Sequence, residues 1–344
     1  MPSSGPLTAP TISGRDLGRP VRSTSSGGSR RWSWCGGPLV LLSLIGANEA
    51  CSGHPSSASG YLEQALDLLE QRALDRGRVD WPKVRTKAHA MAHGARTPAQ
   101  TYPAINRAIA ALGNSHTALI PAGAVPAPSV ARIAVPQGRL IEGRYALLTI
   151  PAFQSDEAGT VRYVAAGRDA VRGLDTAAPC GWLIDLQGNT GGDMWPMLTV
   201  LGDGRIGAFT APGQDALPWE ARGADILLSG RVLGTNPDRL NRTSPPVAVL
   251  TDSSTAGSGE AVAIAFRGLD RARGFGEDTM GFSTSNETLV LADGAYLLIT
   301  TAVMADRGGQ IYGHKVTPDS RVSSGAGGTI AAATEWLSRR PGCD

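Results

Sequence analysis

The sequence predicts an α/β fold in which buried, partly parallel strands alternate with helices. Two apolar, strand-like runs at Tyr145–Ile150 and Gly181–Leu186 are separated by a helical stretch at about 156–174. A third run, Val247–Thr251, breaks into a turn of small residues and continues as a helix at Glu260. This order of strand, helix and strand is typical of βαβ units.

The composition is that of a globular protein. The chain has 344 residues, 42% hydrophobic and 18% charged, so it can bury a large core in two domains or in one domain with extensions. A net charge of +2 implies no nucleic-acid partner. Cys35, Cys51, Cys180 and Cys343 lack paired C-x-x-C spacing, so we expect no zinc site. In an exported protein Cys180 and Cys343 could form a disulfide.

Residues 1–59 are predicted to be a disordered N-terminus with an export signal and a short linker. The signal is indicated by a positive flank at Arg30 and Arg31 and by the apolar segment Pro38–Ala47, which is too short to span a bilayer. Cys51 is a candidate for membrane anchoring through a lipid, although the residues before it are unlike a lipoprotein cleavage box. The pattern predicts an extracytoplasmic protein, secreted or anchored on the outer face.

Residues 60–130 are predicted to form a helical N-terminal subdomain. Leucines spaced four and three residues apart, from Leu62 to Leu69, give the first helix one apolar face. Asp80 is placed to cap a second helix, and Thr97–Gln100 has the form of a capping box that opens a third.

The histidines of this region differ in what they indicate. His89 and His93 lie one turn apart, but no carboxylate completes a metal site, so we interpret them as ordinary helix-face residues. His116 follows the third helix and precedes the strand-like run Ala118–Ile120. A histidine at a rigid helix-to-strand corner can act as a general base, because its unperturbed pKa is near neutrality.

The turn before Glu260 is the candidate nucleophile site. Ser258 lies at a helix N-terminus, where unpaired N–H groups and the helix dipole favour developing negative charge. The N–H groups of Gly259 and of Gly191 or Gly192 are candidate oxyanion donors. The alternative for the Ser258 turn is a small-residue turn that only caps a core helix. The alternative for Gly191-Gly192 is a phosphate cradle, but the Lys-Ser/Thr of a P-loop is missing there.

Further elements are predicted between residues 201 and 244 and after Glu260. Residues 201–244 are rich in Gly, Pro and Asp, which indicates loops or a hairpin over the site. Alternating runs at Glu287–Leu291 and Tyr296–Ala302 predict a hairpin that turns at Asp293-Gly294. A last helix is expected at about Thr329–Arg339.

Six motifs occur together in one order: Leu112–Thr117, Ile184–Gly192, Leu250–Glu260, Gly276–Gly281, Asp293-Gly294 and Pro318-Asp319. In this set the chain resembles the carboxy-terminal processing, or tail-specific, serine peptidase family and its tricorn-core relatives, over roughly Tyr61–Asp319. The resemblance implies a Clp-protease/crotonase-like core of β–β–α units at 131–344 behind an N-terminal helical bundle. It also implies a peptide or protein substrate and no metal or cofactor.

The chain departs from the family pattern in its domains and in its base. About thirty residues between His116 and Tyr145 are too few for the PDZ domain that tail-trimming members carry. Phe282 stands where classical members have their lysine base, so a Ser/Lys dyad is not expected.

The Ser-His pair of tricorn-like members matches Ser115 and His116 instead. The acidic member is open: Gln310 lies near the position of the family's Glu, which leaves Asp306 or Glu287 as substitutes.

The nucleophile is displaced relative to the family. Family nucleophiles usually stand three residues before the helix-opening acid, which is the position of Gly257, whereas Ser258 stands two before Glu260. Either the turn is shifted and Ser258 attacks, or the position is vacant. Ser253 and Ser254 are weaker candidates.

The resemblance implies an exported serine endopeptidase without a PDZ domain. Ser258 would attack the scissile carbonyl, His116 would transfer the proton, and Ser115 with Asp306 would orient the imidazole. One alternative is an inactive, peptide-binding member of the fold. Another is a crotonase-type acyl-CoA enzyme, which would need a cationic path that the sequence does not place near the glycine turns.

Overall fold

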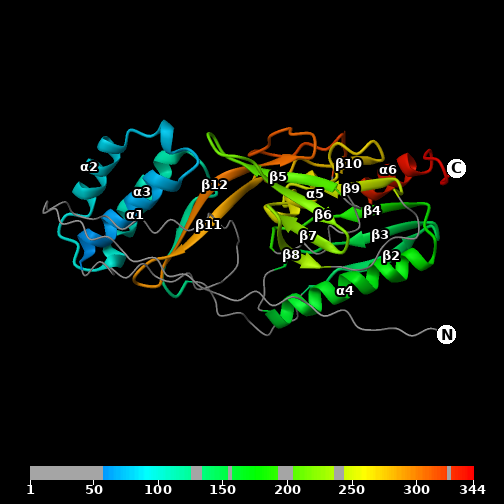
Figure 1. Ribbon diagram of the computed structural model, residues 1–344, viewed down its shortest axis with the longest axis horizontal. Coiled ribbons are helices and arrows are strands. Elements are labelled where there is room, and N and C mark those ends of the chain that lie inside the picture. The colour runs from blue at the N-terminus through cyan, green and yellow to red at the C-terminus, as the bar shows by residue number, and fades with distance from the viewer. Residues whose placement is uncertain (1–56, 125–133, 154–156, 193–203, 236–243, 324–326) are drawn as a thin grey trace, which may run out of the picture. The chain divides into compact units, whose positions relative to one another are not determined.

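The computed structural model describes residues 57–124, 134–153, 157–192, 204–235, 244–323 and 327–344 (Figure 1). The predicted export signal, the predicted disordered segment up to residue 56 and the candidate anchor Cys51 lie outside these ranges. Of the helices within them, none is both long enough and apolar enough to span a bilayer.

A helical region stands at the start of the described chain. It consists of α1 (Ala58–Arg72), η1 (Arg76–Arg78), α2 (Trp81–Met91), η2 (Pro98–Thr101) and α3 (Tyr102–Leu112). The apolar face of α1 is buried along its length, and the Asp80 carboxylate caps α2 by accepting from the Lys83 N–H at 3.2 Å. Gly113 ends α3 with a φ of 74°, a left-handed conformation that glycine adopts without steric cost.

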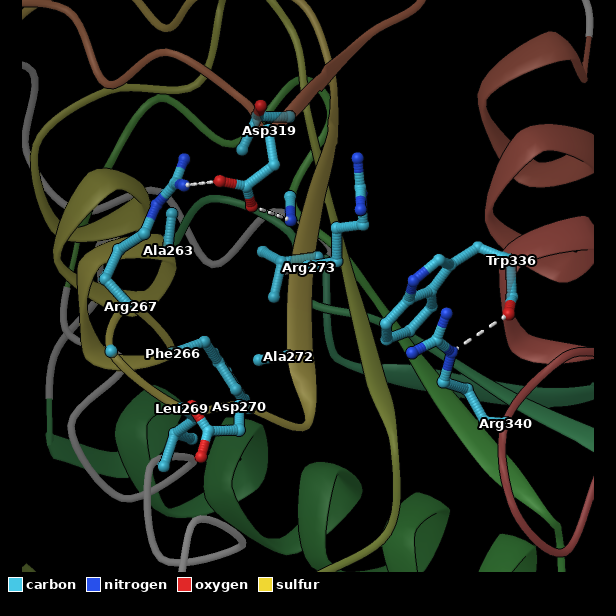
Figure 2. Close-up of a pocket in the computed structure, with 14 residues that line it drawn as sticks. Ala263, Phe266, Arg267, Leu269, Asp270, Ala272, Arg273, Asp319, Trp336 and Arg340 are labelled. Atoms are coloured by element: carbon cyan, nitrogen blue, oxygen red, sulfur yellow. Dashed lines mark hydrogen bonds and ion pairs between the residues drawn. The ribbon is translucent and has the colours of Figure 1, made fainter.

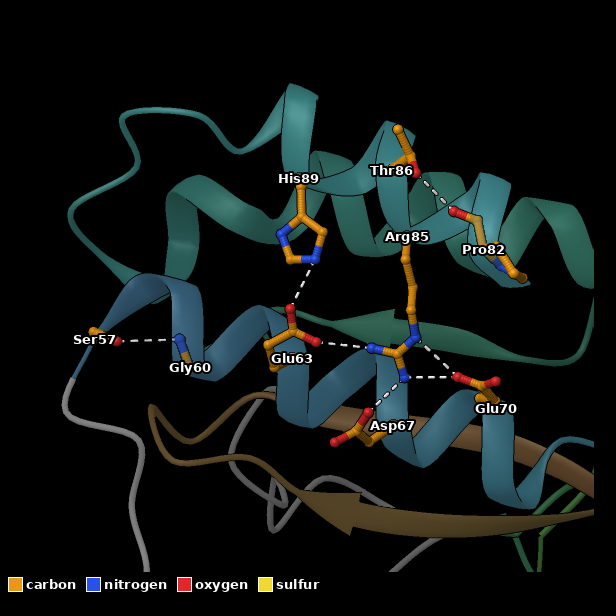
Figure 3. A network of polar contacts seen from close by, with 9 residues as sticks. All are labelled: Ser57, Gly60, Glu63, Asp67, Glu70, Pro82, Arg85, Thr86 and His89. Atoms are coloured by element: carbon orange, nitrogen blue, oxygen red, sulfur yellow. Dashed lines mark hydrogen bonds and ion pairs between the residues drawn. The ribbon is translucent and has the colours of Figure 1, made fainter. Parts of the chain in front are cut away.

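Arg85 of α2 connects this helix to α1 (Figure 3). Its guanidinium donates to the carboxylates of Glu63, Asp67 and Glu70 at 2.5 to 2.9 Å. His89 lies 2.7 Å from Glu63 through Nε2, which places it on a helix face as predicted. Partly exposed pairs of this kind contribute about 1 kcal/mol or less each. The burial of the apolar faces therefore contributes more to the packing of the helices.

A mainly parallel sheet carries the candidate nucleophile turn and the glycine-rich loop. Its order is β13-β10-β9-β4-β3-β2, in which β2 is antiparallel to β3 and the other pairs are parallel. The strands are β2 (Gln137–Ile141), β3 (Tyr145–Thr149), β4 (Gly181–Asp185), β9 (Val247–Thr251), β10 (Ala272–Gly276) and β13 (Ser320–Arg321). Because neighbouring parallel strands end at the same edge, the loops after β4 and β9 meet there.

Helices pack against this sheet as the alternating pattern predicts. Helix α4 (Glu157–Thr176) packs on β2 and β3, and α6 (Gly328–Leu337) packs on β4, β9 and β10. Helix α5 (Ser258–Ala265) packs instead against β5 and β12 of the second sheet. From Ala261 to Ala265 all its side chains are apolar and buried, as expected of a core helix.

The second sheet is antiparallel, in the order β1-β12-β5-β6-β7-β8, with β11 paired to β12. Its strands are β1 (Ala118–Ile120), β5 (Gly204–Thr210), β6 (Leu217–Arg222), β7 (Asp225–Leu228), β8 (Arg231–Thr235), β11 (Thr284–Val290) and β12 (Tyr296–Asp306). The predicted β11–β12 hairpin is confirmed. The expectation of loops, or of one hairpin, over 201–244 is wrong, because β5 to β8 form a meander of short strands.

The helices complete their core with residues from far along the chain. Buried side chains of α1 and α3 pack with Leu291, Leu297 and Ile299 around the β11–β12 hairpin. A separate cluster joins α6 to β9 and β10 and includes Cys343. Cys343 forms a disulfide with Cys180, with Cα atoms 5.0 Å apart, a pairing that the sequence allowed but left open.

Candidate active site

The turn after β9 is held by its own aspartate. Asp252 Oδ1 accepts the N–H groups of Ser254 and Thr255, each at 3.0 Å. Its Oδ2 accepts the N–H of Gly188, and the Ala256 N–H donates to the Asn189 carbonyl at 2.8 Å. The nucleophile turn and the glycine-rich loop are thus joined by one hydrogen bond to the Asp252 carboxylate and one between backbone groups.

Gly257, and not Ser258, has the unusual backbone conformation of this turn. Its φ of 54° and ψ of −116° are rarely adopted by residues with a side chain. A Cβ built on Gly257 would meet only the Gly191 Cα, at 3.9 Å, among the described residues. Ser258 is the first residue of α5 and is half-buried, and its hydroxyl makes no hydrogen bond within the described part of the chain.

Glu260 is fully buried below this turn. Its Oε2 accepts the Gly257 N–H at 3.0 Å, and its Oε1 accepts the Gly281 N–H at 3.0 Å and the Thr279 hydroxyl. Burial raises the pKa of Glu260, although these hydrogen bonds oppose the shift. One carboxylate therefore ties the nucleophile turn to the loop that leads into β11.

The candidate oxyanion glycines lie beside the turn. A Cβ on Gly191 would stand 3.5 Å from the Ala256 carbonyl and 3.7 Å from the Ser258 nitrogen. The Gly191 N–H donates to Asn189 Oδ1, and the Gly259 N–H donates to the Ala256 carbonyl, each at 2.9 Å. Both of these donors are engaged within the loops. Gly192 has a φ of 126° and packs directly on the backbone of Phe153.

His116 is held at the corner between α3 and β1 by residues in and just before β11. Its Nδ1 lies 2.6 Å from Thr284 Oγ1, and its ring stacks on Phe282 with centroids 4.6 Å apart and planes 8° apart. Its backbone carbonyl accepts from Asn286 Nδ2 at 3.1 Å. Burial lowers the pKa of His116, which favours the neutral imidazole that a general base requires.

Ser115 and Asp306 lie elsewhere than the sequence hypothesis places them. Ser115 is exposed. Asp306 is buried, and its carboxylate accepts the N–H groups of Gly308 and Gln310 and, at 3.1 Å, the Tyr312 hydroxyl. Asp306 therefore organises its own turn, and the group at His116 Nδ1 is Thr284.

Within the described residues, the nucleophile turn and His116 are connected through other residues and not by a direct hydrogen bond. Glu260 holds Gly281, and the next residue, Phe282, stacks on His116. No hydrogen bond joins His116 to Ser258, both of which are described. The roles of Thr284 and Glu260 were not predicted from the sequence. The polar run Ser283–Asn286, just before the alternating part of β11, was the signal that could have indicated Thr284.

A cavity of about 400 Å³ lies away from these residues, between α5, β10 and α6 (Figure 2). Arg267 on its wall pairs with Asp319 at 2.6 Å, and Arg340 lies over the Trp336 ring at 4.6 Å. None of the sequence-predicted site residues lines it. In the described ranges, no group of three His, Cys, Asp or Glu side chains is placed to hold a metal ion.

A strand, a tight glycine-serine turn and a helix, with a partly buried histidine connected to the turn through Phe282 and Glu260, form the type of site found in serine hydrolases. The model of peptidase family S41 matches residues 144–322, and this chain belongs to that family. The resemblance to carboxy-terminal processing peptidases and the α/β fold class with N-terminal helices are confirmed.

Similar proteins cover most of the chain. The nisin-resistance protein of Lactococcus lactis subsp. lactis is 27% identical over 288 residues, which are 82% of this chain and 88% of that protein. A lipoprotein structure from Streptococcus agalactiae superposes with a TM-score of 0.70 at 24% identity, covering 82% of this chain and 96% of that one. The photosystem II D1 C-terminal processing protease has a TM-score of 0.58 at 14% identity, covering 84% and 99%.

Proposed function

We propose that this chain is an exported serine endopeptidase that acts through a Ser258–His116 acyl-enzyme mechanism. The observation that carries the proposal is the partly buried imidazole of His116, held at Nδ1 by Thr284 with its ring stacked on Phe282. Membership of a peptidase family supports a peptide or protein substrate. One relative is named for resistance to nisin. For this chain we propose only that the substrate is a peptide or protein.

In this mechanism His116 takes the proton of the Ser258 hydroxyl as the serine attacks the scissile carbonyl, and then gives it to the leaving amine. Water hydrolyses the acyl-enzyme in a second step. The N-terminus of α5 favours the negative charge that develops on the carbonyl oxygen. The N–H groups of Gly191 and Gly259 already donate within the loops. The oxyanion donor in this mechanism is therefore the N–H of Gly192.

We further propose an extracytoplasmic location. The Cys180–Cys343 disulfide is typical of proteins in oxidising compartments, and a structural neighbour is a lipoprotein. The predicted signal within residues 1–56 agrees with this location, and attachment through Cys51 is a proposal of its own. Metabolic labelling with a fatty-acid probe, compared between the full chain and its Cys51→Ser variant, tests it.

A fluorophosphonate probe, which labels activated serines, tests the nucleophile. Wild-type protein should be labelled, whereas Ser258→Ala and His116→Ala should not. Ser253→Ala on the same loop is the matched control and should be labelled as wild type. Labelling of Ser258→Ala on another serine would refute the assignment of Ser258.

A second candidate, a peptide-binding protein without hydrolytic activity, is favoured by the conformation of Gly257. The left-handed turn position three residues before Glu260 has no side chain, and there is room for one. In that case wild-type protein is not labelled and still binds peptides. Gly257→Ser would then gain labelling, while Gly257→Ala, which adds the same backbone strain without a hydroxyl, would not. Family membership favours either candidate over an acyl-CoA enzyme.

A further inference from the structure

Three residues in and just before β11 contact different parts of His116. Phe282, which precedes the strand, covers a ring face, Thr284 reaches Nδ1 and Asn286 donates to the backbone carbonyl. The pairing of β11 with β12 shifts its register between Ser285 and Asn286, and the three contacts together restrain both the ring and the backbone of the histidine.

The same corner is fixed from behind by a continuous hydrogen-bond network. Asn286 Oδ1 accepts the Thr300 hydroxyl at 2.9 Å, and the Thr300 N–H donates to Thr117 Oγ1 at 3.1 Å. Asn114 accepts the Thr117 N–H at 2.9 Å and donates to Asp75 at 3.1 Å. The backbone of His116 therefore cannot shift easily, and the contact of its Nδ1 with Thr284 is set by the fold.

The carboxylates on the elements around His116 bind other donors, and Glu287 does so through Oε1 while its Oε2 is buried without a partner among the described residues. Asp75 pairs with Asn114, Glu287 of β11 with Arg72, and Glu260 with the turns on either side of it. Asp306 of β12 is held by its own turn. The partner of the imidazole is thus a neutral hydroxyl where a catalytic triad has a carboxylate.

We propose that Thr284 is the positioning residue of His116: its hydroxyl accepts the Nδ1–H and fixes the tautomer in which Nε2 is the free base. The inference rests on the proposed role of His116 as base. A hydroxyl holds the ring through one hydrogen bond, as a carboxylate does, but unlike a carboxylate it can also donate, and it stabilises the imidazolium less. The histidine therefore stays unprotonated at neutral pH. Because its partner offsets less of the positive charge that forms on the ring during proton transfer, the reaction relies more on the α5 N-terminus, which stabilises the negative charge on the carbonyl oxygen.

Substitutions of Thr284 separate orientation from packing. Thr284→Val keeps the shape and removes the acceptor, Thr284→Ser restores it, and Thr284→Asp adds a charge. Nitrogen-15 NMR of the imidazole should show one tautomer in wild type and Thr284→Ser and a mixture in Thr284→Val. The Thr284→Val variant should be labelled by fluorophosphonate at least about tenfold more slowly, since positioned proton transfer contributes on the order of a hundred-fold or more. Thr288→Val, on the exposed part of β11, is the matched control and should change neither readout.

Thr284→Asp should raise the pKa of His116 by about one unit or more, because an adjacent carboxylate favours the imidazolium. An unchanged tautomer ratio in Thr284→Val, or an unchanged pKa in Thr284→Asp, overturns the proposal. The NMR readouts do not need a nucleophile. If wild-type protein is not labelled, Ser258 fails as the nucleophile, while the tautomer and pKa still decide the role of Thr284.

Discussion

The two halves of the candidate site are held by partners at very different distances along the chain. In the nucleophile turn, Asp252 binds residues two and three positions later, and Glu260 binds Gly257 three positions earlier. His116 is bound by Thr284 and Asn286, 168 and 170 residues away. The first half combines these local bonds with bonds to the loop after β4, such as that from the Gly188 N–H to Asp252, 64 residues away. The second exists only when the β11–β12 hairpin docks beside α3 and β1.

Loss of the disulfide should have the largest effect and should act on the nucleophile half, since Cys343 packs with the strands that carry that turn. The bond closes a loop with a sequence separation of 163. We expect Cys343→Ser to lower the free energy of unfolding by about 4 kcal/mol, measured by urea denaturation. Reduction of the wild type with dithiothreitol should produce a similar loss. Equal stability of the oxidised wild type and the variant would show that the cross-link does not support this sheet.

Glu260→Ala should cost about 3 kcal/mol, because it leaves the buried donors of Gly257, Gly281 and Thr279 without their acceptor. Urea denaturation measures the loss. Glu335→Ala, which removes an exposed carboxylate paired with Arg339 on α6, is the control and should change stability by less than about 0.5 kcal/mol. If Glu260→Ala lowers the free energy of unfolding no more than Glu335→Ala does, the buried carboxylate does not stabilise the nucleophile turn.

Asp293→Ala should cost about 2 kcal/mol on the histidine side, since Asp293 accepts both the Tyr61 hydroxyl at 2.8 Å and the Tyr102 hydroxyl at 2.5 Å. Burial raises the pKa of Asp293, but the hydrogen bonds from the two tyrosines outweigh it and lower the pKa overall. Amide exchange should accelerate in α1 and α3 and remain slow in β9. Acceleration spread evenly over both sheets would contradict the division into two halves.

The smallest effect expected is a pH dependence due to His116. Burial lowers its pKa in the folded state, whereas in the unfolded chain the pKa stays near 6.5. The unfolded chain is therefore protonated first, and stability present above pH 6.5 is lost as the pH falls toward the folded-state pKa. His116→Gln should flatten this part of the stability curve, measured by thermal unfolding between pH 7.5 and 5. His93→Gln, in the helical region, should leave the curve unchanged.

Much of the fold could be predicted from local patterns. The buried runs of β3, β4 and β9, the caps of α2 and α3 and the turn at Asp293-Gly294 each depend on neighbouring residues. The meander β5–β8 was missed because polar residues interrupt the apolar positions of its strands and its turns are rich in Gly and Asp. Its pairing is decided by contacts such as the burial of Trp219.

The sequence by itself determined the family, the parallel sheet and the placing of small residues and a serine at the mouth of α5, because these depend on order and spacing. Tertiary structure alone decided that Gly257 has the left-handed turn position and that Thr284 rather than Asp306 meets His116. The reason is physical: a hydrogen bond between residues 168 apart leaves no periodic trace in a single chain and appears only when packing brings the two groups together.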